Sequence, residues 1–321
     1  MLFFGSLDDV PADFGPSAVT IGKFDGLHVG HRRVIDQLRA AADAEGLVST
    51  VVTFDRNPLA VLHPEICPVS LSSNEQKRAR LESTGIDATV MIEFTPEFSR
   101  LSPEDFVHRV LVDGLHARLV YVGSDFRFGH GGAGTVDLLV ELGAESGYEV
   151  RIIEPVRPDG KRPISSTWIR SLLADGLVGE AAELLGRLPS VRGEVVRGEQ
   201  RGRELGYPTA NLSPSLEGFV PADGVYAGYL TLDGQMKPAA ISIGNNPTFE
   251  GVADKQVEAH VLDETIDLYG RTVEVSFVEF IRGMRKFPDV RELVAQMKRD
   301  ETQIREILRL PLRPPTTGQP A

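Results

Sequence analysis

The sequence predicts two unlike domains, an α/β domain with a parallel sheet and, after it, an antiparallel barrel or sandwich with a terminal helix. In the first half, apolar runs of strand length alternate with segments of helical periodicity, which is typical of βαβ units. After about Leu188, short apolar runs follow one another with turn signals such as Asp233-Gly234 between them, which favours a barrel or sandwich. A length of 321 residues fits about two domains.

The elements of the first half follow from periodicity and capping. Ser102-Pro103 with an acid three residues after the serine indicates a helix start. Because ligands of parallel sheets bind beyond the carboxyl ends of the strands, the segments that follow the strands are the places to search for a site. We expect strands at 18–21, 48–54, 89–94, 119–122 and 149–153, and helices at 32–40, 73–82, from 102 onward and at 135–142.

The second half has a different pattern of hydrophobic residues, with short apolar runs separated by turns. We expect short strands at 193–196, 225–232, 239–243, 257–262 and 273–280, and a helical pattern over 287–310. The apolar residues of that helix that can face a core are Val290, Leu293, Val294, Met297, Ile304 and Ile307. The domains are therefore expected at 1–186 and 187–310, with a frayed, flexible tail at 311–321.

Composition excludes several classes of protein. The formal net charge of −12 argues against a general nucleic-acid binder but not against small phosphorylated ligands. The single cysteine, Cys67, excludes an internal disulfide and a multi-cysteine metal site, and its thiol is expected to act as a small, partly buried apolar group. Neither a signal peptide nor an apolar run of bilayer length is evident, so we expect a cytoplasmic protein without a membrane partner. The oligomeric state, homo-oligomer included, stays open.

The densest motif is the run 22–31, GKFDGLHVGH, between a predicted strand and a predicted helix. A helix start offers free N–H groups and positive potential to an anion, and Gly22 and Gly30 let phosphate oxygens approach the backbone. His28 and His31 can donate hydrogen bonds to a phosphate as its charge shifts during transfer. The arrangement suits ATP held for attack at its α-phosphate, although a histidine pair with glycine also occurs in ordinary turns.

Three further segments leave strands or precede a helix on the same expected sheet edge: 53–58 (TFDRNP), 122–129 (VGSDFRFG, followed by the glycines of 131–134) and 164–170 (ISSTWIR). Each segment also fits an ordinary structural role. Ser165-Ser166-Thr167 also fits a simple helix cap, Phe126 and Phe128 also fit a core, and 131–134 also fits a loop.

The second dense motif is 197–211, RGEQRGRELGYPTAN. Its glycines and arginines, Gly198, Arg201, Gly202 and Gly206, can wrap a polyphosphate. In an extended segment Thr209 and Asn211 lie on one face, so their oxygens could share a Mg²⁺, which prefers few protein oxygens together with phosphate and water. A solvated basic turn before an ordinary strand is the alternative.

Taken together, these motifs resemble the bifunctional prokaryotic riboflavin kinase/FAD synthetase family over almost the whole chain. The run 22–31 matches its GxFDGxHxGH motif, 164–170 its ISSTxIR motif, 208–211 its PTAN motif and 244–249 its GxNPTF turn. The resemblance implies that riboflavin is phosphorylated by ATP to FMN, and that ATP adenylylates FMN to FAD and pyrophosphate, with Mg²⁺ as cofactor. Riboflavin, FMN and ATP would be its small-molecule partners. For the fold, the resemblance implies a Rossmann-like nucleotidyltransferase domain followed by a small antiparallel β-barrel kinase domain.

The resemblance also implies residue roles. In the first half His28 and His31 would be catalytic. The ATP site would include Gly22, Phe24, Asp25, Gly30, Ser165, Ser166, Thr167 and Arg170, and the flavin and adenine region Asn57, Pro58, Asp125, Phe126 and Phe128. In the second half Thr209 and Asn211 would bind Mg²⁺ and ATP phosphates, helped by the phosphate loop, and Glu258 would accept the proton of the riboflavin 5′-hydroxyl. Without the family, Glu258 is an acid on a strand surface and His260 a structural histidine.

The chain departs from the family pattern at three positions: Pro163 stands where arginine is common, with Arg162 before it, Asn57 where histidine is frequent, and Gln200 where a glycine is common. These departures leave open a relative with one working module. A flavin-binding regulatory protein with relic motifs is a second alternative. A different small-molecule nucleotidyltransferase is a third, but it leaves the second half unexplained.

Overall fold

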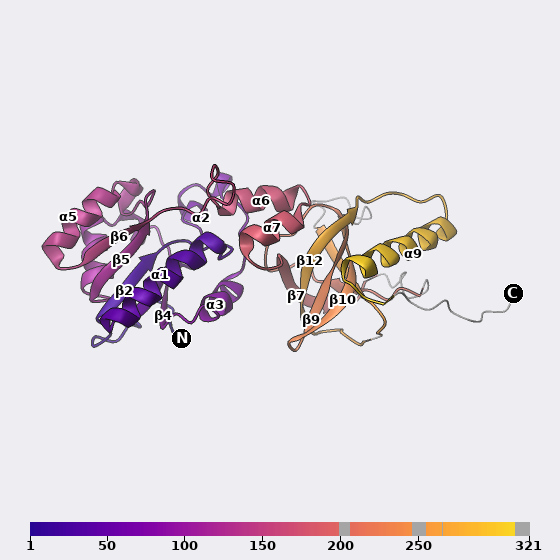
Figure 1. Ribbon diagram of the computed structural model, residues 1–321, viewed down its shortest axis with the longest axis horizontal. Helices are drawn as coiled ribbons and strands as arrows, with labels where there is room; N and C mark the ends of the chain where they lie inside the picture. The colour runs from indigo at the N-terminus through magenta and orange to yellow at the C-terminus, as the bar shows by residue number, and fades with distance from the viewer. Residues whose placement is uncertain (199–205, 246–254, 265, 312–321) are drawn as a thin grey trace. The chain divides into compact units, whose positions relative to one another are not determined.

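The computed structural model describes residues 1–198, 206–245, 255–264 and 266–311 (Figure 1). The chain forms two compact units, Met1–Ser166 and Thr167–Ala321. The first is an α/β unit and the second contains a closed antiparallel barrel, so the predicted fold class is confirmed.

A parallel sheet with the order β1-β4-β3-β2-β5-β6 forms the centre of the first unit. The chain runs from β2 to β3 on one side and later returns to β5 on the other, so the sheet has a switch point between β2 and β5. Ligands of such sheets bind at this point. The strands are β1 (Leu2–Phe4), β2 (Ser17–Ile21), β3 (Val48–Phe54), β4 (Ala88–Ile92), β5 (Ala117–Gly123) and β6 (Glu149–Ile153).

Helices cover both faces of this sheet, which is why its central strands are apolar on both sides. On β2, Val19 belongs to one buried cluster, with the segments 106–111 and 136–142, and Ala18 to the other, with Leu38 and Leu81. The helices are α1 (Val29–Glu45), α2 (Leu59–Leu62), α3 (Asn74–Glu82), α4 (Pro103–Phe106), which continues into a π-helical turn (Val107–Val112), and α5 (Val136–Ser146).

The strands of the second unit close into a barrel with the order β10-β11-β8-β7-β12-β9. Gly228 allows β9 to lie close to β12, because a Cβ at this position would be 2.1 Å from the carbonyl oxygen of Ser276. The strands are β7 (Ser190–Val196), β8 (Ala210–Leu212), β9 (Gly224–Leu232), β10 (Gln235–Asn245), β11 (Lys255–Val261) and β12 (Thr272–Arg282). The helices are α6 (Ser166–Ala174), which begins at the boundary of the units, α7 (Val178–Leu185) and α9 (Val290–Ile307).

The division between the units differs from the expected one. Sequence patterning places it at 186–187, whereas the compact units meet at Ser166 and Thr167. Helix α7 packs against β12, and the amide of Ala222 donates to the carbonyl oxygen of Leu173, so the segment after Ser166 is built into the barrel unit. Which activity this segment serves stays a prediction. Of the predicted tail, 312–321 lies outside the described residues.

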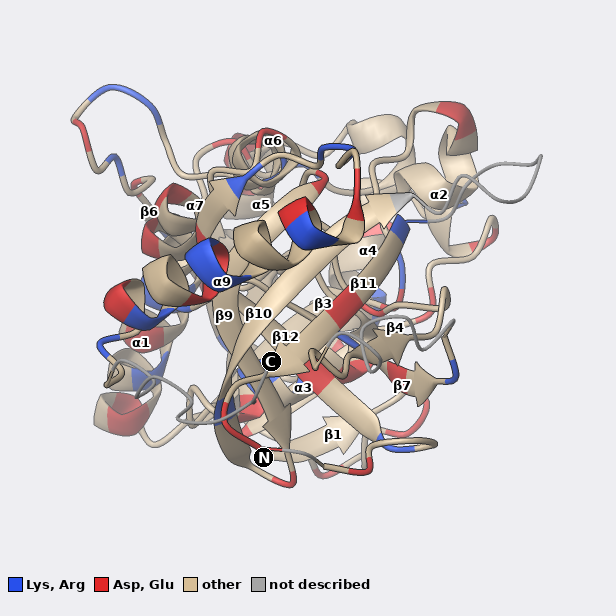
Figure 2. Ribbon diagram, turned by 90° about the vertical axis from the view of Figure 1, so that its right-hand side faces the viewer, with Lys and Arg blue, Asp and Glu red and all other residues tan. Residues whose placement is uncertain are grey.

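Helix α9 differs from its apolar prediction in one respect. Val290, expected to face a core, is 57% exposed and marks only the start of the helix. Ile304 is buried against the barrel, but the other buried residues of α9 are the charged Asp300, Glu301 and Arg305. Figure 2 shows residues of both charges along this helix.

Two ion pairs explain these buried charges. The guanidinium group of Arg282 on β12 donates to both carboxylate oxygens of Asp300, at 3.1 Å to Oδ1 and 2.8 Å to Oδ2. Arg305 donates to Glu301 one turn earlier and to Asp263, which follows β11. Bidentate pairs of this kind are directional, so they fix the position of α9 along the barrel.

Replacing Arg305 by methionine is expected to destabilise the barrel unit by about 3 kcal/mol, because it leaves the carboxylate of Glu301 without its buried partner. Urea unfolding measures the change. The matched control is Arg299→Met on the exposed side of α9, expected within about 0.5 kcal/mol of the parent. Equal losses in the two variants would contradict the assignment.

Candidate active sites

The histidine turn after β2 has a defined geometry. His28 is the N-cap of α1, and its Nδ1 accepts a hydrogen bond from the amide of His31 at 3.3 Å. The two imidazole rings stack, with centroids 3.6 Å apart and planes at 16°. A Cβ at Gly30 would be 3.1 Å from Nδ1 of His28, so glycine makes room for this ring. Because Nδ1 accepts, neutral His28 carries its proton on Nε2 and can donate from there.

The protonation of His31 follows from its surroundings. Its Nδ1 is buried and has no hydrogen-bond partner within the described part of the chain. Burial, then the neighbouring His28 and then Lys77 lower the pKa of His31 well below its ordinary value. The imidazole is therefore neutral near pH 7. A bound phosphate would supply the negative charge that favours its protonation.

The loop before His28 is held in an unusual backbone conformation. Phe24 and Leu27 have positive φ angles of 47° and 38°, and both side chains are buried. Asp25 stabilises the loop because its Oδ1 accepts from the amide of Leu71 at 2.8 Å. Strained backbone that the surrounding structure holds in place is common at functional sites.

The 164–170 segment meets this loop, as the sequence predicts. The hydroxyl of Ser166 donates to the carbonyl oxygen of Asp25 at 2.9 Å, although the two residues are 141 positions apart. Ser166 is the first residue of α6, so a second helix N-terminus begins beside the histidine loop. The places of Thr167 and Arg170 relative to the histidines stay predictions, because both belong to the second unit.

The segment after β3 is also tied to the histidine loop, through a hydrogen bond of 3.1 Å from Oγ1 of Thr53 to the carbonyl oxygen of Lys23. Asn57 uses its side chain locally, because Oδ1 accepts from the amide of Leu59 at the start of α2. Asn57 and Pro58 are half-buried. Their contact with flavin stays a prediction.

The segment after β5 contains three predicted flavin contacts, and their surroundings differ. Phe128 is 5% exposed and belongs to the core, where it packs on Phe106, so the structure favours the core reading of this ring. Phe126 stacks on Phe128 with centroids 5.7 Å apart and is half-buried, and Asp125 is exposed. These two remain candidates for ligand contact.

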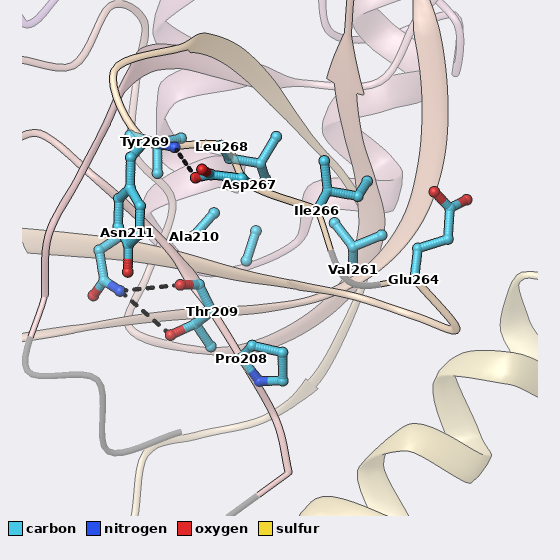
Figure 3. Close-up of a pocket in the computed structure, with 12 residues that line it drawn as sticks. Pro208, Thr209, Ala210, Asn211, Val261, Glu264, Ile266, Asp267, Leu268 and Tyr269 are labelled. Carbon is cyan, nitrogen blue, oxygen red and sulfur yellow. Dashed lines mark hydrogen bonds between the residues drawn. The ribbon is translucent and has the colours of Figure 1, made fainter. Parts of the chain in front are cut away.

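In the barrel unit, Thr209 and Asn211 lie together (Figure 3). The side-chain amide of Asn211 donates to Oγ1 of Thr209 at 3.3 Å. A Cβ at Gly198 would be only 2.5 Å from the Asn211 amide carbon, so the phosphate-loop backbone lies directly against this side chain. Beside them is a cavity of about 260 Å³, whose lining includes Ile266, Leu268 and Tyr269.

Glu258 lies directly across the strands from Asn211. The two are register partners on β11 and β8, and Ser242 on β10 is the partner of Glu258 on its other side. Partners in an antiparallel ladder share one face, so Asn211, Glu258 and Ser242 form a row across three strands. Asn211 therefore belongs both to this row and to the cavity lining.

His260 has the structural role that its position suggests. Its Nδ1 donates to the carbonyl oxygen of Pro208 at 2.8 Å, and its ring meets the ring of Tyr207 edge-on at 5.2 Å. The histidine thus holds the backbone immediately before Thr209.

Other predicted residues lie outside the described ranges: Gln200, Arg201 and Gly202 of the phosphate loop and most of the 244–249 turn. Gly206 is described and has a φ of 82°. In the residues with described structure, no group of three His, Cys, Asp or Glu side chains could hold a metal ion.

Sequence reasoning missed several residues around the two sites. Ser72, whose Oγ accepts from the amide of Gly26 at 3.4 Å, lies just before α3, and Lys77 lies within this helix, which carries no motif. The cavity residues 266–269, Ile-Asp-Leu-Tyr, carry no motif either.

The pKa of His31 predicts a pH-dependent stability. The unfolded chain takes up a proton at the ordinary pKa, but folded His31 does not, so the free energy of unfolding falls as the pH drops below about 6.5, by up to ~1.4 kcal/mol per pH unit. In His31→Gln this slope becomes shallower. Urea unfolding between pH 5 and 7.5 measures this slope in the parent and in His31→Gln, and hydrogen exchange of the β2 amides is a second readout. The exposed His63→Gln is the control. An unchanged slope in His31→Gln would contradict the low pKa.

Comparison with known proteins covers both units. A family model described as FAD synthetase matches residues 10–168, and one described as riboflavin kinase matches 185–308. The chain is 36% identical over 293 residues to a bifunctional riboflavin kinase/FMN adenylyltransferase of Escherichia coli K12, covering 91% of this chain and 93% of that protein. A protein of Listeria monocytogenes with the same description is 35% identical over 288 residues, covering 89% of this chain and 91% of that protein.

One solved structure shares almost the whole fold. It is described as a macrolide-efflux protein from Streptococcus pneumoniae and has a TM-score of 0.85 at 33% identity, with 95% of this chain and 98% of that chain covered. Within the described residues, no helix of this chain is long and apolar enough to cross a membrane. The two family models and the similarity over nine-tenths of the length establish that the chain belongs to the bifunctional riboflavin kinase/FMN adenylyltransferase family.

Proposed function

We propose that this chain performs two consecutive ATP-dependent transfers, phosphorylation of riboflavin to FMN in the barrel unit and adenylylation of FMN to FAD in the α/β unit. The observation that carries the proposal is that each unit contains its own set of candidate groups: the stacked histidines at the sheet edge, and the row of Asn211, Glu258 and Ser242 on the barrel. Each unit also matches its own family model.

In the kinase reaction Glu258 accepts the proton of the riboflavin 5′-hydroxyl as that oxygen attacks the γ-phosphate of ATP, and ADP leaves. The cross-strand position of Glu258 opposite Asn211 supports this role, because it brings the base next to the phosphate-binding residues. Gly198 places backbone against Asn211, where phosphate oxygens can be bound. The apolar side chains of the adjacent cavity suit the nucleoside of ATP.

The donor set of Thr209 and Asn211 fits Mg²⁺, a hard cation that prefers a few protein oxygens together with phosphate and water. The two side chains are in direct contact, and the described residues offer no carboxylate and histidine cage that would favour a transition metal. When bound, Mg²⁺ would neutralise phosphate charge.

In the adenylylation reaction a phosphate oxygen of FMN attacks the α-phosphate of ATP, and pyrophosphate leaves. His28 donates from Nε2 to a phosphate oxygen, and His31 stabilises the developing charge beside it. The N-terminus of α1 provides further donors for the triphosphate, and the hydroxyl of Ser166 holds the loop before this helix through its bond to Asp25. The flavin is expected near Asn57 and Phe126. A cytoplasmic location is proposed with this assignment.

The separation of the sites predicts separable activities. Glu258→Ala is expected to lower FMN formation from riboflavin by at least about 100-fold, because it removes the general base, and to spare conversion of supplied FMN to FAD. His28→Ala is expected to do the reverse. Chromatography of flavins after incubation with ATP and Mg²⁺ measures both.

The matched controls are exposed residues of the same type, Glu194→Ala in the barrel and His108→Ala in the α/β unit, which should keep both activities. Loss of both activities in either test variant, with the fold intact, would refute separate sites. Parent protein that converts only one of the two substrates would instead show that one module is inactive.

The tight contact at Gly198 gives a second test. Gly198→Ala displaces the Asn211 side chain and is expected to lower the kinase kcat/KM by about tenfold or more, with adenylylation unchanged. Steady-state kinetics at varied ATP and Mg²⁺ measure it. Gly179→Ala in α7, where a Cβ has ordinary space, is the control. A Gly198→Ala variant with parent kinetics would show that the position of Asn211 does not matter.

A further inference from the structure

We propose that Lys77 is a positioning residue of the nucleotidyl-transfer site, a buried fixed cation bound to the end of β3 that sets the electrostatic environment of His31. Nothing in its sequence context marks Lys77, which lies in the middle of the short helix α3. The inference rests on the proposed function of the histidine turn.

The burial of Lys77 is the first observation. It is 6% exposed, and lysine is almost never buried to this extent without a partner. Its ammonium group donates to the carbonyl oxygen of Phe54, the last residue of β3, at 2.8 Å. This carbonyl lies at the carboxyl edge of the sheet, where the ligand is expected. Burial lowers the pKa of Lys77, so the charge is held there at a cost in desolvation.

The surroundings of Lys77 are the second observation. The charged groups that act on it are the carboxylates of Asp25, in the histidine loop, and Asp55, directly after β3, and both favour the charged ammonium. Each carboxylate also holds a backbone amide, of Leu71 and of Phe94 respectively. Both carboxylates belong to segments that the sequence predicts to form the site, and Asp55 is in addition paired with Arg56 at 2.6 Å.

The link to the imidazoles is the third observation. The charged groups that act on His31 are His28 and Lys77, and both disfavour its protonation. Lys77 therefore helps to keep His31 neutral before an anion is bound. A neutral imidazole can take up charge when phosphate arrives.

A purely structural role explains these facts less well. Helix α3 has its own capping box between Ser73 and Gln76, so it does not need Lys77 to begin. Methionine fills a similar volume without the desolvation cost of a buried charge, so packing alone does not require lysine at this position. A retained buried cation next to an imidazole pair is typical of a functional site.

The test compares Lys77→Met with Lys77→Arg. We expect Lys77→Met to move the acid limb of the pH profile of kcat/KM for adenylylation of FMN up by about half a pH unit, which lowers kcat/KM about threefold on that limb and leaves the plateau at higher pH unchanged. Lys77→Arg keeps the charge and should keep the position of that limb. Riboflavin kinase activity of the same preparations is the internal control for folding. Arg78→Gln, which removes an exposed charge from the same helix, is the matched control.

A uniform loss at every pH in Lys77→Met, or an acid limb in Lys77→Arg that moves as far as in Lys77→Met, would overturn the proposal. Should Lys77→Met fail to fold, NMR titration of His31 in the parent and in Lys77→Arg decides: values below about 6.5 in both are expected, and an ordinary value in the parent refutes the proposal. His31→Ala distinguishes the two hypotheses. Full adenylylation in that variant would refute the role proposed for the histidine, whereas an inactive His31→Ala beside a parent-like Lys77→Met would refute only that of Lys77.

Discussion

The α/β site depends on one unusual interaction, an imidazole that caps a helix. Serine, threonine, aspartate and asparagine are the common N-caps. Here the cap is His28, and the same contact that satisfies the amide of His31 also sets the proton of His28 on Nε2. The contact that caps α1 therefore also sets the tautomer of His28 that can donate to a phosphate. The glycine at position 30 belongs to this arrangement, because any side chain there would push the imidazole away.

The barrel site depends on register instead of capping. Asn211, Glu258 and Ser242 come from three strands and share a face only because the ladders pair them residue by residue. A slip of one residue on β11 would turn Glu258 to the opposite face and replace it with an apolar neighbour. The alternation of buried and half-buried residues along β11 opposes such a slip, so the packing of the barrel protects the position of the proposed base.

Most of the fold and part of the candidate sites could be predicted from the sequence, and the predictions that failed did so for physical reasons. Patterning predicted the strands of both units because their apolar runs are long and separated by clear turns. It missed β1 and β8, which have three residues each, and α7, which lies beyond the last motif of the first half. It read Val290 as core because apolar spacing does not reveal where a helix begins. Charged Asp300 and Arg305 could not be recognised as buried, since only their tertiary partners make burial tolerable.

For the site, the motifs predicted that Ser166 would meet the histidine loop. They were silent on Lys77, whose importance comes entirely from contacts made across the sheet edge.

The ionic attachment of α9 has a consequence for the order in which the chain becomes competent during its synthesis. Asp263 begins the segment that continues along the nucleotide cavity, and its partner Arg305 is among the last described residues of the chain. The α/β unit is complete at Ser166, so it can mature while the ribosome is still making the barrel. The cavity segment gains this anchor only after α9 has been made, so the kinase half matures after the α/β half.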